Sequence, residues 1–156
     1  MMKKSINIGE NKIEFQLIES ENYWCWQGYL DIADIKTEFE IDCGFYKGKV
    51  NWKDIEEFLS FIIEPNRIEK LARIHNESIT KIGQNFFSNS KEIENWKMIF
   101  KNSIQLFGIS DKHTFSYGLV FDFYEKTEQG IEGDAYGLYF VKMENEQWIA
   151  SERYQI

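Results

Sequence analysis

The hydrophobic period of this chain changes twice, and no other feature of the sequence constrains the fold as strongly. Apolar and polar residues alternate in roughly the first third and the last quarter, as in half-buried strands. Between these segments apolar residues recur every three to four positions, which is typical of amphipathic helices. The order strands, helices, strands predicts an α+β fold in which one or two antiparallel sheets pack against about three central helices.

The first segment predicts a meander of short strands. Alternation runs over residues 6–8, 13–17, 23–32 and 37–43, and the connections between these runs are short. Short connections favour antiparallel neighbours. We expect Trp24 and Trp26, which share one face of the third run, to point into the core.

The middle segment predicts three helices. Asn51 is a suitable N-cap for the first helix, which Pro65 ends. The second helix is predicted over 68–86. The third runs from residue 89 or 90 to Gly108, a residue type that commonly follows a helix C-terminus.

Strand periodicity returns in the last segment. We predict a strand over 115–123, a polar loop over 125–134, and a hairpin whose strands cover 136–143 and 147–154. Residues 136–143 are almost continuously apolar, which indicates a strand buried on both faces.

Length and composition favour one domain over residues 1–156. Hydrophobic residues make up 43% of the chain, enough for a substantial core, and no Gly/Ser/Pro-rich linker divides it. The N-terminus lacks a long apolar run, so the sequence predicts no signal peptide, no membrane partner and a cytoplasmic location. Cys25 and Cys43 lack CxxC spacing and are expected to be reduced and packed.

The acidic excess lies in the strand segments. The net charge is −3 over residues 1–50, zero over 51–110 and −5 over 111–156, which gives −8 for the chain. Nucleic acid binding depends on cationic side chains that contact phosphates, so this balance disfavours it.

No residue pattern indicates catalysis, a cofactor or a metal. His75 lies on an apolar helical stripe and His113 precedes a strand, and neither has a His or Cys at ligand spacing. The glycines form no phosphate-binding loop. The sequence therefore predicts no catalytic residues, no cofactor and no metal site, and it leans against an enzyme.

If the tryptophans point inward, the opposite face of the meander gathers acids and tyrosines. The candidate partner-binding residues on it are Glu14, Tyr29, Asp31, Glu38, Glu40 and Asp42. Tyrosines anchor protein interfaces, and carboxylates steer the association of basic partners. The plain alternative is that these acids only keep an outer sheet face soluble.

Two stretches resemble uncharacterised bacterial domain families. They are Trp26-Gln27-Gly28-Tyr29-Leu30-Asp31-Ile32, followed by Phe39-Glu40-Ile41, and Asp134-Ala135-Tyr136-Gly137-Leu138-Tyr139-Phe140-Val141, followed by Trp148. Small acidic domains with this layout include immunity proteins of bacterial contact-dependent and polymorphic toxin systems. The resemblance implies stoichiometric binding of a toxin and occlusion of its active site, without transferring a role to any single residue.

Two other function classes stay open at this point. One is a small enzyme or small-molecule binder with a pocket between sheet and helices, lined by Tyr117, Tyr136, Tyr139 and Trp148. The other is a self-associating module that pairs sheet edges near Ile6 or Tyr154. The sequence fixes neither the partner nor the oligomeric state.

Overall fold

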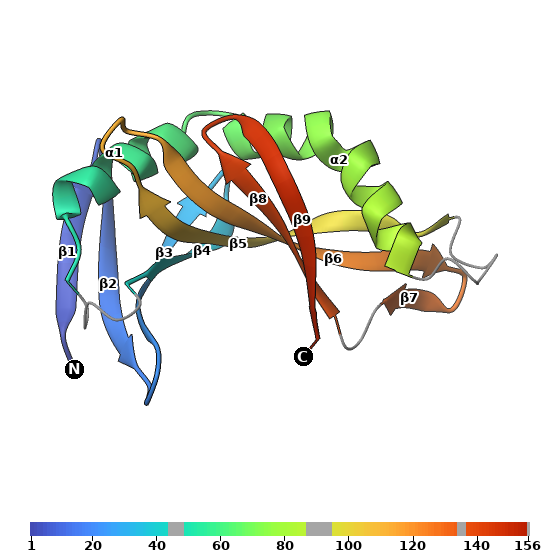
Figure 1. Cartoon of the computed structure of the whole chain (residues 1–156), viewed down its shortest axis with the longest axis horizontal. Helices are drawn as coiled ribbons and strands as arrows, with labels where there is room; N and C mark the ends of the chain where they lie inside the picture. Colours follow the sequence, from blue (N-terminus) through green and yellow to red (C-terminus); the bar gives the residue numbers. More distant parts are fainter. Residues whose placement is uncertain (44–48, 87–94, 134–136, 156) are drawn as a thin grey trace.

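The described strands of this protein belong to one sheet, and two helices lie across one of its faces (Figure 1). The computed structural model describes residues 1–43, 49–86, 95–133 and 137–155. The sheet order is β1-β2-β3-β4-β5-β6-β8-β9, and β7 pairs with β6. The strands are β1 (Lys3–Ile8), β2 (Asn11–Glu19), β3 (Trp24–Ile32), β4 (Ile35–Asp42), β5 (Lys97–Ile109), β6 (Phe115–Thr127), β7 (Gly130–Gly133), β8 (Gly137–Glu144) and β9 (Gln147–Gln155), and the helices are α1 (Trp52–Ile62) and α2 (Arg67–Phe86). This is an α+β fold in which the sheet predominates.

Strands β1 to β4 form the antiparallel meander expected from the sequence. Gly9 has a positive φ of 58° in the turn between β1 and β2, a conformation that glycine adopts without steric cost. Ala33 and Asp34, with φ of 50° and 63°, link β3 to β4 as a two-residue hairpin loop. Positive φ at both loop residues matches the right-handed twist of the flanking strands.

The expectation of a purely antiparallel sheet is wrong, because β4 and β5 pair in parallel. Both helices lie in the long connection between these two strands. A crossover of this length brings the chain back to start β5 in the same direction as β4, which a short hairpin cannot do. The sheet is therefore mixed.

The predicted third helix is also wrong. Residues 89–94 of that prediction lie outside the described residues, and Lys97–Ile109 is strand β5. Ile104 and Phe107 resemble a helical pair in spacing, yet Ile104 is buried and Phe107 is 37% exposed. The register shifts between Phe100 and Ile104, where Asn102 has a φ of 56°, and this irregularity breaks the period-2 signal.

The helices cover what we call the inner face of the sheet. Helix α1 begins at the N-cap Asn51, whose side chain accepts a hydrogen bond from the Lys53 amide at 3.1 Å. Its buried stripe consists of Ile55, Phe58, Leu59 and Ile62. Helix α2 approaches the sheet at Gly83, where a Cβ would lie only 2.6 Å from the Met98 methyl group.

Aromatic side chains join helix α1 to the sheet. Trp52, the first residue of α1, packs edge-on against Trp26 with ring centroids 5.0 Å apart. Phe58 contacts Tyr117, whose ring is fully buried. Trp24 is half-buried and packs against the same core, so the prediction that both tryptophans turn inward is confirmed.

The C-terminal segment differs from its prediction in two ways. The expected loop over 125–134 contains the end of β6 and the short strand β7. In β8 the buried residues alternate with half-buried ones, so this strand is covered on its inner side more than on the other. Tyr136, the predicted start of the strand, lies outside the described residues.

Within the described part of the chain, no helix has the length and apolar character needed to cross a membrane.

Candidate functional site

The face opposite α1 and α2, which we call the outer face, carries a row of paired residues across eight strands, and most of them are polar. Each member is the cross-strand partner of the next. The row consists of Lys3, Gln16, Gln27, Glu40, Gln105, Gly118, Lys142 and Ala150. Because directly paired residues share one side of a sheet, the row defines a single continuous surface.

Glu40 is the centre of a hydrogen-bond network on this surface. Its carboxylate accepts bonds from the Tyr23 hydroxyl and from the Gln105 side-chain amide, the latter at 2.7 Å. All three side chains are half-buried. Burial and the bond to Glu40 both raise the pKa of Tyr23, so its hydroxyl stays protonated and keeps donating to the carboxylate.

Cys25 lies beside this network and behaves as a structural thiol. Burial, followed by the charge of Glu40, raises its pKa to about 11. A thiol with this pKa is protonated near neutral pH and is a poor nucleophile. Both cysteines are free and buried, as predicted from the sequence.

Five of the six predicted partner-binding residues lie on β3 and β4, namely Tyr29, Asp31, Glu38, Glu40 and Asp42. Tyr29 is 44% exposed, and its hydroxyl donates to Glu38 at 3.0 Å. Glu38, Glu40 and Asp42 occupy successive outward positions of β4 and are half-buried. The predicted separation of tryptophans and carboxylates onto opposite faces is therefore confirmed for these strands.

Glu14 and Asp31 each have a lysine on the neighbouring strand. Glu14 on β2 forms an ion pair with Lys3 at 2.8 Å, and this lysine lowers the pKa of its carboxyl group. Asp31 is exposed near the end of β3, where its cross-strand partner is Lys36. Lys36 Nζ also lies 4.4 Å from the Tyr29 ring centroid, so this lysine adds positive charge to the acidic part of the face.

An aromatic patch on the same face was missed by the sequence analysis. We define it as Phe107, Phe140 and Tyr154. The rings of Phe140 and Tyr154 meet edge-on at 4.8 Å, and a Cβ on Gly118 would lie 3.0 Å from the Phe107 ring. Phe107 was assigned to a helical stripe, and only the strand alternation of Ile104 to Phe107 could have revealed its outward direction.

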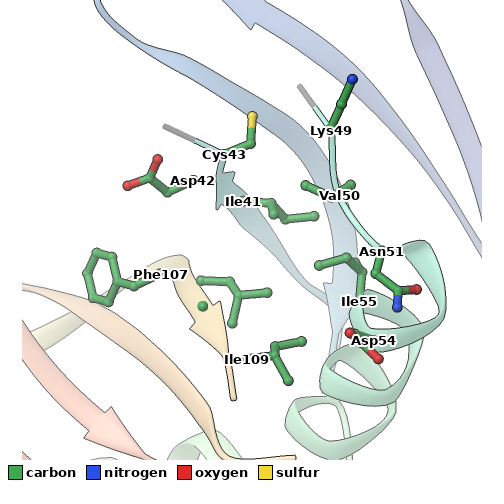
Figure 2. Close-up of a pocket in the computed structure, with 12 residues that line it drawn as sticks. Ile41, Asp42, Cys43, Lys49, Val50, Asn51, Asp54, Ile55, Phe107 and Ile109 are labelled. Atoms are coloured by element: carbon green, nitrogen blue, oxygen red, sulfur yellow. The ribbon is translucent and has the colours of Figure 1, made fainter. Parts of the chain in front are cut away.

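A pocket of about 430 Å³ lies between the C-terminal ends of β4 and β5 and the start of α1 (Figure 2). It is bounded by the ends of β4 and β5 on one side and the start of α1 on the other. Asp42 and Phe107 belong to its sheet wall, and Asn51 and Asp54 to its helix wall. We call this the α1 pocket.

One group of side chains offers metal-ligating atoms, although the sequence predicted no metal site. Asp54 and Glu57 of α1 and His113 of the β5–β6 connection place one potential ligand atom each within 4.8 Å of the others. His113 Nδ1 lies 3.0 Å from a Glu57 carboxylate oxygen. His113 is far from α1 in sequence, so spacing along the chain could not reveal the group.

The aromatic pocket considered as an alternative is not built as expected. Tyr117 and Tyr139 are buried in the core and do not line the α1 pocket. They also do not line a second pocket of about 490 Å³, which lies between the β3–β4 hairpin, β5 and the start of α2. Trp148 is half-buried and donates its indole N–H to Ser151 at 3.2 Å. Tyr136 lies outside the described residues.

In comparisons with known proteins, this chain matches no family model, no curated protein and no solved structure at a significant level.

Proposed function

We propose that this chain is a non-enzymatic binding protein whose outer face docks a protein with a basic surface. The observation that carries the proposal is that acids and aromatic rings gather on different parts of that face. Strand β4 presents Glu38, Glu40 and Asp42, whereas β5, β8 and β9 present the aromatic patch, beside which Glu152 is paired with Lys142 at 2.8 Å. Long-range charge attraction and local aromatic anchoring are the two contributions that a specific protein interface needs.

The rigidity of the acidic part of the face supports this function. Hydrogen bonds hold Glu38 and Glu40 to tyrosines before any partner arrives. Ordering flexible side chains costs roughly 0.5–1.5 kcal/mol for each one immobilised at an interface. A preorganised carboxylate avoids part of this cost, whereas acids serving only solubility have no need for fixed positions.

The aromatic patch supplies exposed apolar area. Phe107 is 37% and Tyr154 is 47% exposed, and Lys142 lies 5.9 Å from the Phe107 ring centroid. Aromatic residues are enriched at the cores of protein interfaces, where they bury large areas with few rotatable bonds. The patch is therefore the expected anchor once the carboxylates have oriented the partner.

An immunity-type inhibitor is the specific form of this proposal. Such a protein binds a toxin stoichiometrically and covers its active site, and an acidic face suits a toxin that acts on nucleic acid through a basic cleft. A toxin encoded beside this chain is the first partner to test. The cytoplasmic location of the complex stays a prediction from the sequence.

The proposal is tested by capture with matched charge reversals. The intact chain and the double variant Glu38→Lys/Asp42→Lys are immobilised and exposed to the candidate toxin. We expect the variant to lose most of the binding, because it replaces negative charge at the centre of the proposed interface.

The control is Glu56→Lys/Glu77→Lys, which changes net charge equally at exposed positions on the two helices. We expect this variant to bind as the unmodified chain does. If both variants lose toxin binding to the same extent, net charge alone determines binding. If both variants bind the toxin as the unmodified chain does, the acids of the outer face are not part of the interface.

A further inference from the structure

The group formed by Asp54, Glu57 and His113 stands apart from the proposed docking face. Asp54 and Glu57 are three residues apart on α1, so their side chains lie on the same side of the helix. The imidazole arrives from the connection between β5 and β6, where His113 has a φ of 56°. Two separate elements therefore bring an imidazole and two carboxylates to one point.

The potential ligand atoms of this group lie close enough to be gathered by one ion. All three lie within 4.8 Å of one another, and His113 Nδ1 lies 3.0 Å from a Glu57 carboxylate oxygen. Nitrogen and oxygen ligands lie about 2.0–2.2 Å from zinc, so two ligands of a tetrahedral ion are roughly 3.3–3.6 Å apart. Separations above this range must shorten by side-chain rotation when the ion binds.

Among the described residues, no lysine or arginine forms an ion pair with the carboxylates of this group. Asp54 has no ion-pair partner there, and the partner of Glu57 is His113. Two carboxylates and an imidazole are a donor set that a divalent ion of the zinc type accepts.

Asp54 connects this group with the α1 pocket of about 430 Å³ (Figure 2). Glu57 and His113 are not among the residues that line this pocket. Three protein ligands leave at least one position for water on a tetrahedral ion.

We infer that Asp54, Glu57 and His113 form a binding site for one divalent transition-metal ion of the zinc type, with water as the remaining ligand. An imidazole ligand suits Zn²⁺ or Co²⁺, whereas Mg²⁺ prefers oxygen ligands only. The inference does not depend on the docking function of the outer face.

Calorimetric titration of the tag-free, chelator-treated chain with Zn²⁺ tests the inference, and the visible absorption of Co²⁺ reports the ligands. We expect one ion to bind per chain. His113→Asn, which tolerates positive φ, and Asp54→Asn should each weaken zinc binding at least about ten-fold, the scale on which metal sites respond to altered ligand shells. His75→Ala, which removes the chain's other histidine, should leave the affinity unchanged.

The absence of Zn²⁺ binding at micromolar concentrations would overturn the inference. So would unchanged affinity in Asp54→Asn, a loss in His75→Ala equal to that in His113→Asn, or Mg²⁺ binding as tight as Zn²⁺ binding. Thermal unfolding of each variant without metal is the check on folding. Because Asp54→Asn leaves the β5–β6 connection intact, it tests the site even if His113→Asn destabilises the fold.

Discussion

At the scale of single residues, Gly28 has a role that its strand pattern does not reveal. It faces the core between Trp26 and Leu30, and a Cβ at this position would lie 2.7 Å from the Phe15 ring. Phe15 is fully buried and packed against Trp52, so the ring has little room to move. Because Gly28 has no side chain, the Phe15 ring of β2 can pack over β3.

We expect Gly28→Ala to lower the free energy of unfolding by about 1–3 kcal/mol, the usual cost of overpacking a core. Gly108→Ala is the matched control, because no atom lies within 4 Å of its added Cβ and its φ is not positive. Urea denaturation compares the two proteins. Equal stabilities for both variants would contradict the proposed close contact.

The thiol of Cys25 gives a second residue-scale prediction. Burial raises its pKa to about 11, from the value of 9.0 that is ordinary for a thiol. Between these pH values the unfolded chain has released the proton while the folded chain retains it. The free energy of unfolding should therefore fall as pH rises through this window.

Cys25→Ala lacks the titrating group, so its stability should fall less than that of the unmodified chain over the same pH range. The raised pKa of Tyr23 adds a further decline in both proteins at higher pH. Urea denaturation below and inside the window measures the difference. An identical loss of stability in the two proteins would show that Cys25 titrates normally.

At the scale of elements, periodicity predicts segments well where one period lasts and poorly where the chain is irregular. The meander and both helices have uninterrupted periods, and the sequence places them correctly. Strand β5 has a register shift near Asn102, so its apolar residues imitate helical spacing. The sequence also did not predict the parallel pairing of β4 with β5, because this pairing depends on where the chain rejoins the sheet after the long crossover.

Helix α1 supplies the element-scale prediction, because its start positions both Asp54 and Glu57. The Asn51 side chain satisfies one of the free amides at the helix N-terminus. Asn51→Ala should lower the free energy of unfolding by about 1 kcal/mol, whereas Asn51→Asp keeps the capping oxygen and should stay within a few tenths. Thermal or urea unfolding measures the stability of both variants. Equal losses of stability in Asn51→Ala and Asn51→Asp would contradict the capping role of the Asn51 side chain.

At the scale of the whole molecule, the arrangement of the sheet determines which candidate residues meet. The acids of β4 could be placed together from the sequence, because strand alternation fixes the side to which they point. Gln105 and the aromatic patch could not, since their position depends on the mixed strand order. The metal-ligating group depends on a contact between α1 and a distant turn, which local patterns do not encode.

The central claim is that the acidic part of the outer face steers a basic partner. The rate constant for association with an identified toxin, measured at rising ionic strength, tests it most directly. We predict that the rate falls steeply with salt for the unmodified chain and for Glu56→Lys/Glu77→Lys, and that it is low and nearly independent of salt for Glu38→Lys/Asp42→Lys. A rate that is unaffected by salt, or three proteins with the same salt dependence, would contradict the claim.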